Sequence, residues 1–103
     1  MRVGFVMRLL PGAEGEYRQR HAAVWPEMLD ELKRAGARNY SIFQNGEDLF
    51  GYLEVDDLDR FRAHMEASAV NQRWQADMER LIDPLKDPET GFHHQLDEVF
   101  HLD

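Results

Sequence analysis

The sequence predicts an α+β fold with elements in the order β-α-β-β-α-β, and three observations carry this prediction. Residues 3–10 alternate with a period of two, which is typical of a strand. Asn45-Gly46 separates two apolar runs, which is a strong signal for a β-hairpin. Residues 13–35 and 58–81 carry apolar side chains at spacings of three and four, which is typical of helices.

The first strand ends at Pro11-Gly12, and the helical region after it is interrupted in the middle. Pro26 has no N–H to donate to the carbonyl of Ala22, so one straight helix is not expected. We predict one helix that ends near Ala22 and a second that starts near Pro26 and is closed by Gly36. The break leaves His21 near a helix C-terminus, where an irregular backbone can open a pocket.

The second half of the chain is predicted to hold a hairpin, two helical regions, a loop and a last strand. The strands are expected over residues 38–44, 49–55 and 95–102, and the loop over 83–94. Asp56 or Asp57 is expected to cap the first helix of this half, and Ser68 can cap the next one, because their short oxygen-bearing side chains accept hydrogen bonds from a first turn.

This element order is that of the ferredoxin-like split βαβ arrangement, an antiparallel sheet with helices on one face. The 103 residues are expected to form one domain, residues 1–103. A chain of this size has little margin for leaving the second sheet face exposed. We therefore expect a homodimer, a dimeric α/β barrel in which two sheets face each other.

Charge and composition exclude several classes of function. The formal net charge of −8 disfavours nucleic acid and anionic membranes as partners. The chain has no cysteine, so thiolate chemistry and disulfides are absent. Arg8 interrupts the N-terminal apolar segment before a signal core could form, and no apolar run approaches membrane-spanning length. A cytoplasmic location is the resulting expectation.

Tyr17 and His21 form the first candidate site. They are four residues apart, so they are neighbours on one helix face. Histidine can give or take a proton near neutral pH, and a tyrosine hydroxyl can hold a ligand or orient the imidazole. The same spacing also fits a half-buried histidine whose ring is hydrogen-bonded to a backbone carbonyl. Both the functional and the purely structural interpretation of His21 therefore stay open.

Other candidates have packing alternatives of the same kind. Tyr40 could face a pocket or pack as an ordinary strand aromatic, and Trp74 could belong to the core or stack on the C–H edges of a sugar. His93-His94 suggests a metal site, but adjacent strand residues point apart and no second cluster has ligand spacing. We expect no metal site, and the sequence has no glycine-rich phosphate loop.

Five segments carry a shared signature across the chain. They are Tyr17-Arg18-Gln19-Arg20-His21, Val24-Trp25-Pro26-Glu27, Gly36-Ala37-Arg38-Asn39-Tyr40, Val70-Asn71-Gln72-Arg73-Trp74 and Glu98-Val99-Phe100-His101-Leu102. Together they resemble the L-rhamnose mutarotase family from end to end. The resemblance implies a dimeric ferredoxin-like enzyme that interconverts the α and β anomers of L-rhamnose without a cofactor.

By matching positions, the resemblance implies that His21 is the proton donor. It implies that Tyr17 and Tyr40 contact the substrate and that Trp74 lines the sugar site. The family commonly has a second tryptophan where this chain has Gln75, so the substrate is expected to be L-rhamnose or another 6-deoxy sugar such as L-fucose. The general base stays open between water, a tyrosine hydroxyl and His21 acting as a relay.

Two other classes of function fit the same architecture. Some dimeric α/β barrels are monooxygenases or haem-binding proteins that place histidine and aromatic residues between helix and sheet. The chain could also be a non-enzymatic small-ligand-binding domain. A colourless protein would count against haem, and a His21→Ala variant that changes stability alone would favour the non-enzymatic domain.

Overall fold

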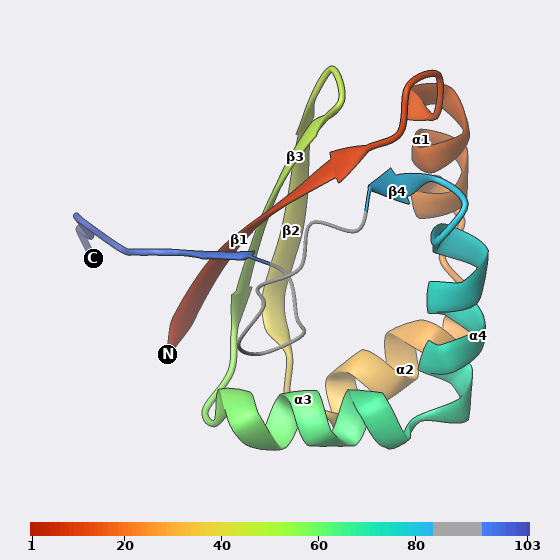
Figure 1. The fold of residues 1–103 in the computed structure, drawn as a ribbon. Coiled ribbons are helices and arrows are strands. Elements are labelled where there is room, and N and C mark those ends of the chain that lie inside the picture. Colours follow the sequence, from red (N-terminus) through yellow and green to blue (C-terminus); the bar gives the residue numbers. More distant parts are fainter. Residues whose placement is uncertain (84–93) are drawn as a thin grey trace.

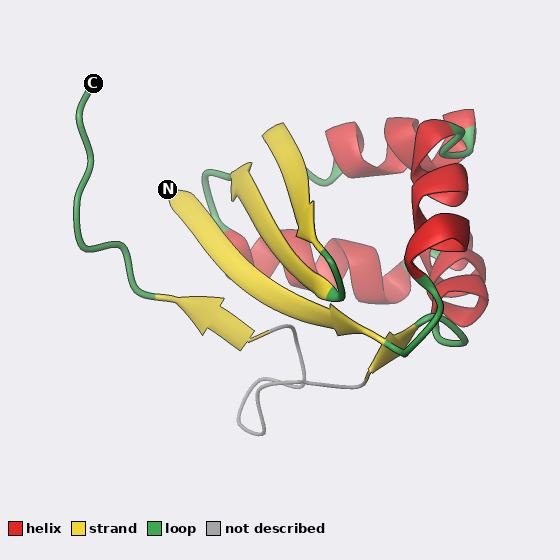
Figure 2. Cartoon of the chain, turned by 90° about the horizontal axis from the view of Figure 1, so that it is seen from above, coloured by secondary structure: helices red, strands yellow, loops and turns green. Residues whose placement is uncertain are grey.

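The computed structural model describes residues 1–83 and 94–103, and in them four helices lie on one side of an antiparallel sheet (Figures 1 and 2). The elements are β1 (Arg2–Leu9), α1 (Glu14–Ala22), α2 (Pro26–Arg34), β2 (Arg38–Asn45), β3 (Asp48–Glu54), α3 (Leu58–Ala67), α4 (Ala69–Met78), β4 (Ile82–Asp83) and β5 (His94–Leu96). The strand order is β2-β3-β1-β4, and β5 also pairs with β1. This is the predicted ferredoxin-like arrangement.

The helical region after β1 breaks where the sequence predicts. Helix α1 ends at Ala22 and α2 begins with Pro26 in its first turn. Between them Ala23 leaves helical geometry, with φ −139° and ψ 52°. Gly36 follows α2 with a φ of 99°, a value that glycine adopts without steric cost. The break is therefore a direct consequence of local sequence.

Helices α3 and α4 are capped by the predicted residue types. Of the two candidates before α3, Asp57 is the cap, and its carboxylate accepts a 3.1 Å hydrogen bond from the backbone of Arg60. Ser68 ends α3 and also begins α4, where its hydroxyl accepts from the backbone N–H of Asn71 at 3.1 Å. The chain turns sharply at this serine, so α3 and α4 form two adjacent walls (Figure 1).

The core lies between the inner face of the sheet and the helices. Strand β1 sends every second side chain into it, and Phe5 and Leu9 are each 1% exposed. Strand β3 adds Leu49 and Leu53 on the same face. Gly51 lies directly opposite Phe5 in the β1–β3 register, and the Phe5 ring covers it.

The predicted last strand over residues 95–102 is wrong in its extent. Strand β5 ends at Leu96, which pairs with Gly4, and Arg2 is the first residue of β1. Glu98 still pairs with Arg2 at 2.8 Å, and the chain beyond it runs past the end of its partner strand and away from the body (Figure 2). A short strand β4, which the sequence did not predict, pairs with the other end of β1.

Most of the predicted loop 83–94 lies outside the described residues, and so does His93 of the histidine pair. Within the part of the chain that the structure describes, no helix is long and apolar enough to cross a membrane.

Candidate active site

A cavity of about 510 Å³ opens between the inner face of the sheet and the helices. Its apolar lining comes from Phe5 and Leu53 of the sheet and from Met28 and Leu32 of α2. Polar side chains enter it from the end of α1, from β2 and from α3 and α4. A cavity of this size, mostly apolar with a few polar groups, is typical of a small-molecule site.

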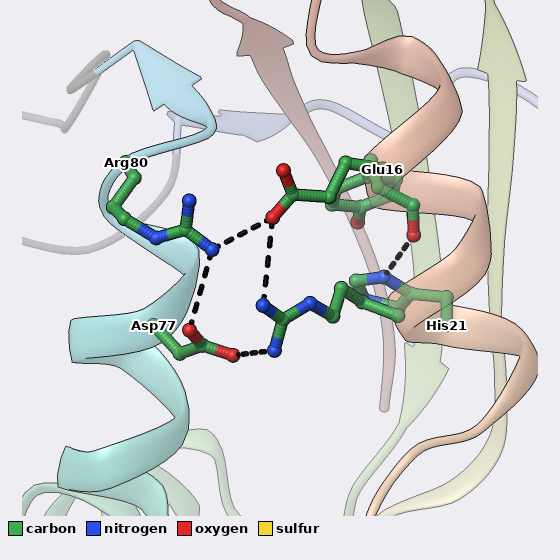
Figure 3. A network of polar contacts seen from close by, with 6 residues as sticks. Glu16, His21, Asp77 and Arg80 are labelled. Atoms are coloured by element: carbon green, nitrogen blue, oxygen red, sulfur yellow. Dashed lines mark hydrogen bonds and ion pairs between the residues drawn. The ribbon is translucent and has the colours of Figure 1, made fainter.

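His21 lines this cavity from the last turn of α1. Its Nδ1 lies 3.0 Å from the backbone carbonyl oxygen of Tyr17 (Figure 3). A carbonyl can only accept a hydrogen bond, so Nδ1 carries the hydrogen in the neutral ring and Nε2 keeps a lone pair. Both interpretations of His21 that the sequence left open are therefore compatible: one ring nitrogen is hydrogen-bonded to the backbone, and the ring still faces the cavity as a candidate acid or base.

Burial sets the charge of His21. Removal from water lowers the pKa of the imidazole below its ordinary value of 6.5, and the hydrogen bond to the Tyr17 carbonyl opposes this shift only partly. The ring is therefore neutral at pH 7, with Nε2 available as a proton acceptor.

Tyr17 supports the imidazole from behind. Its ring stacks on His21 with centroids 3.9 Å apart and an interplanar angle of 26°. The side chain is buried, and burial is the main reason why the pKa of its hydroxyl is raised. The nearby Tyr40 phenol makes a smaller contribution in the same direction. Tyr17 is not among the described residues that line the cavity, so its predicted contact with substrate stays a prediction.

Trp74 is both a core residue and part of the cavity wall. It is 5% exposed, and its ring meets His21 edge to face with centroids 5.5 Å apart. On another side it meets Trp25 in the same geometry at 5.1 Å, and Trp25 comes from the break between α1 and α2. The imidazole is thus held between the Tyr17 ring and the Trp74 ring.

Tyr40 lies on the same face of strand β2 as Ile42, and both line the cavity. A bulge precedes it in the strand. Arg38 pairs with Glu54 and Ser41 with Tyr52, so β2 has one more residue than β3 across this stretch. Asn39 takes up the extra length with a φ of 47°. The Tyr40 ring then meets Phe5 edge to face at 6.1 Å, and desolvation raises the pKa of Tyr40 to about 12. Tyr40 is therefore a neutral hydroxyl in the cavity wall.

Gln75 lines the cavity beside three polar residues that the sequence analysis did not select, Arg62, Glu66 and Asn71. The Gln75 amide donates to the Asn71 side-chain oxygen at 3.2 Å. Asn71 in turn donates to the carbonyl of Met65 at 2.9 Å, which ties α4 to the end of α3. In the sequence, these cavity residues are indicated only weakly, by two pairs of polar residues on consecutive helices, with the members of each pair four positions apart.

The described residues contain no group of three or more histidine, aspartate or glutamate side chains placed to share a metal ion. His94 lies on β5 opposite Val6, on the sheet face away from the helices.

Comparison with known proteins gives a consistent result. The family model described as L-rhamnose mutarotase matches residues 2–102. The chain is 44% identical over 110 residues to the L-rhamnose mutarotase of Ligilactobacillus salivarius, and 39% identical over 104 residues to that of Oceanobacillus iheyensis. The first match covers 100% of this chain and 98% of the relative, and the second covers 99% and 98%.

Solved structures agree with the sequence matches. The crystal structure of an L-rhamnose mutarotase from Formosa agariphila superposes with a TM-score of 0.80 at 26% identity, covering 100% of this chain and 99% of that one. Tetracenomycin F2 cyclase from Streptomyces glaucescens has a TM-score of 0.65 at 18% identity over 100% of this chain and 97% of its own, which shows a shared fold alone. From its sequence matches over nearly the whole chain, this protein belongs to the L-rhamnose mutarotase family.

Proposed function

We propose that this enzyme interconverts the α and β anomers of L-rhamnose or a related 6-deoxy sugar in the cavity beside His21. Family membership supports a sugar mutarotase over a monooxygenase, a haem protein or a non-enzymatic domain. The observation that carries the proposal is the state of His21, a neutral imidazole whose Nε2 is free of the backbone contact and whose ring faces the cavity. The reaction transfers protons and breaks and re-forms the C1–O5 bond with no change of oxidation state, so no redox cofactor is needed.

The His21 tautomer supports a relay in which one residue serves as base and acid. Nε2 accepts the proton of the anomeric hydroxyl, the O–H electrons form the C1=O1 double bond, and the C1–O5 bond breaks toward O5. The imidazolium then donates the proton to O5, which completes the open-chain aldehyde. Rotation about C1–C2 and the reverse proton transfers close the ring as the other anomer. The lowered pKa of His21 favours return of the proton to the sugar.

The remaining cavity residues are suited to holding the sugar. The neutral Tyr40 hydroxyl can both donate to and accept from a sugar hydroxyl. Trp74 presents an aromatic edge or face to the C–H groups of the ring, and Gln75 supplies an amide at the cavity wall. Tyr17 acts through His21 by stacking, and the contact of its hydroxyl with the sugar stays a prediction.

Magnetisation transfer between anomeric protons tests the proposed function. L-rhamnose, L-fucose and D-glucose are compared with and without enzyme, at a pH where uncatalysed exchange is slow. We expect enzyme-dependent exchange for at least one 6-deoxy-L-sugar and none for D-glucose. Absence of acceleration for both 6-deoxy sugars would contradict the proposal.

The pH dependence follows from the lowered pKa of His21. We expect kcat/KM to be flat between pH 7 and 8 and to fall as the pH drops through a midpoint below 6.5, because protonation removes the Nε2 lone pair. The pKa of this histidine is higher in the unfolded chain than in the folded protein, so the unfolded chain binds the proton first as the pH falls. The free energy of unfolding therefore decreases below pH 6.5. Circular dichroism at each pH separates the two effects. A rate that rises on acidification would show that the imidazolium is the resting form.

We further propose a homodimer formed through the outer face of the sheet. Phe43 and Phe50 pair across β2 and β3 on this face, and the side chain of Phe43 is 65% exposed. Leu96 extends the apolar strip from β5, and the extended C-terminal segment adds exposed Val99 and Phe100. A second copy is the occupant that suits this face, because a twofold axis pairs each strip with its own counterpart.

Light scattering after gel filtration tests the dimer. Wild type is expected at twice its 12.1 kDa chain mass, and Phe43→Lys is expected to shift toward the monomer. Gln19→Lys adds the same charge on exposed helix α1 and should leave the mass unchanged. A monomeric wild type, or a Phe43→Lys protein that dimerises as well as wild type, would refute this interface.

The cytoplasmic location is likewise proposed, and cell fractionation checks it.

A further inference from the structure

We propose that four charged residues outside the cavity, Glu16, Arg20, Asp77 and Arg80, form a clamp that positions His21 against Trp74. We call this set the α1–α4 clamp. The inference rests on the proposed function, since it assigns positioning residues to the same reaction. The clamp residues are not themselves catalytic residues, because none of them lines the cavity.

The clamp is a closed ring of alternating charges (Figure 3). Arg20 pairs with Asp77 across the two helices through Nη1 and Oδ2, and its Nη2 lies 3.5 Å from Glu16 Oε2. Arg80 closes the ring, because its Nη2 lies 2.7 Å from Glu16 Oε2 and 3.5 Å from Asp77 Oδ1. Each guanidinium thus bridges two carboxylates, Arg20 through both terminal nitrogens of its planar fork and Arg80 through Nη2 alone.

The ring joins the two walls that hold the imidazole. Arg20 directly precedes His21 in the last turn of α1, and Asp77 lies one turn after Trp74 on α4. The backbone of α4 packs mainly on α2 and α3 in the described part of the chain. The polar contacts of the clamp therefore connect α4 to the end of α1, where the helix stops at Ala22 and its last turn is prone to fraying.

The contribution of the clamp is geometric more than energetic. The side chains of Arg20 and Asp77 are 37% and 24% exposed, and ion pairs open to water contribute little to stability. Proton transfer is far more sensitive, since displacement of a reacting group by about 1 Å can lower a rate by about a hundredfold. A clamp of modest strength can therefore have a large effect on turnover while changing the folded state little.

The test compares Asp77→Asn, which keeps the shape and removes the charge, with Asp77→Glu, which keeps the charge. We expect Asp77→Asn to lower kcat by about tenfold or more, with a change in KM of no more than about threefold. Asp77→Glu should recover most of the activity. The matched control is Asp48→Asn, which removes a charge from an exposed ion pair with Arg8 at the far side of the sheet.

Proton NMR supplies a readout that does not depend on turnover. The Hε1 proton of His21 senses the ring currents of Tyr17 and Trp74, so its shift reports the packing of the three rings. Asp77→Asn should move this resonance and change the titration midpoint of His21, while Asp48→Asn should change neither. If Asp77→Asn does not fold, Glu16→Gln is measured in the same way and is expected to move the same resonance.

Two results would overturn the clamp. One is a folded Asp77→Asn protein with wild-type kcat and an unchanged His21 spectrum. The other is equal loss of thermal stability in Asp77→Asn and Asp48→Asn with no separate effect on His21. If wild type accelerates no sugar, the proposed function fails, and the NMR comparison still decides whether the clamp positions His21.

Discussion

Replacing His21 with glutamine is expected to reduce kcat for anomer interconversion by about a hundredfold or more, the typical contribution of general acid–base catalysis. Glutamine has a planar amide that can donate a hydrogen bond, and it keeps part of the stacking surface. It cannot take a proton from the anomeric hydroxyl and return it to the ring oxygen. The substitution therefore removes the relay while it preserves much of the packing between Tyr17 and Trp74.

Magnetisation transfer measures this loss directly, and His21→Ala provides a second variant in which the ring is removed completely. Tyr17→Phe is the matched control, because it keeps the stacked ring and the backbone carbonyl and removes only the hydroxyl. We expect Tyr17→Phe to retain far more activity than His21→Gln. A folded His21→Gln protein with wild-type turnover would rule out the proposed mechanism even if the enzyme is a mutarotase.

Substituting alanine for Gly51 is expected to be strongly destabilising. A Cβ at this position would lie 2.5 Å from Cε1 and Cε2 of Phe5, and nearer still to Cζ. Phe5 is 1% exposed and lines the cavity, so its ring can move only by displacing core neighbours or by entering the cavity. Overpacking of this kind costs about 1–3 kcal/mol. For a domain of this size, that lowers the melting temperature by roughly 5–20 °C.

The same substitution is expected to affect the cavity. Phe5 forms part of the cavity lining and meets the Tyr40 ring edge to face at 6.1 Å. A displaced Phe5 ring would therefore shift Tyr40 or intrude on the space for the sugar, and KM should rise in the fraction that stays folded.

Thermal unfolding followed by circular dichroism checks the Gly51→Ala prediction, and Gly15→Ala is its matched control. Gly15 lies inside α1, has ordinary backbone geometry, and an added Cβ there meets no atom within 4 Å. Alanine at this position should leave stability unchanged or raise it by about 0.4–1 kcal/mol. Equal melting temperatures for wild type and Gly51→Ala would show that the core can absorb the methyl group.

Much of the fold is encoded in short stretches of sequence. Pro26 predicts the break between α1 and α2 because its missing N–H removes a hydrogen bond within the same helical turn. Ser68 and the Asn45-Gly46 pair act over similarly short distances, and both lie where the structure has a cap and a hairpin turn. The extent of the last strand was wrong because it depends on how far the chain stays paired with β1, a partner at the opposite end of the chain.

The candidate site could likewise be predicted only in part. His21, Tyr40, Trp74 and Gln75 could be selected from the sequence, through the resemblance that their motifs carry, and the structure brings all four to one cavity. The order of the rings around the imidazole and the place of Tyr17 behind it could not be selected, because these contacts join residues up to 53 positions apart.

By itself, the sequence determined the element order, the helix break, the caps and the family of this protein, because each depends on neighbours along the chain or on motifs within it. Only the tertiary structure decided the tautomer of His21, the bulge that precedes Tyr40 in β2, and the ring of charges that joins α1 to α4. These features depend on which distant side chains and carbonyls meet, and on how much water their packing removes.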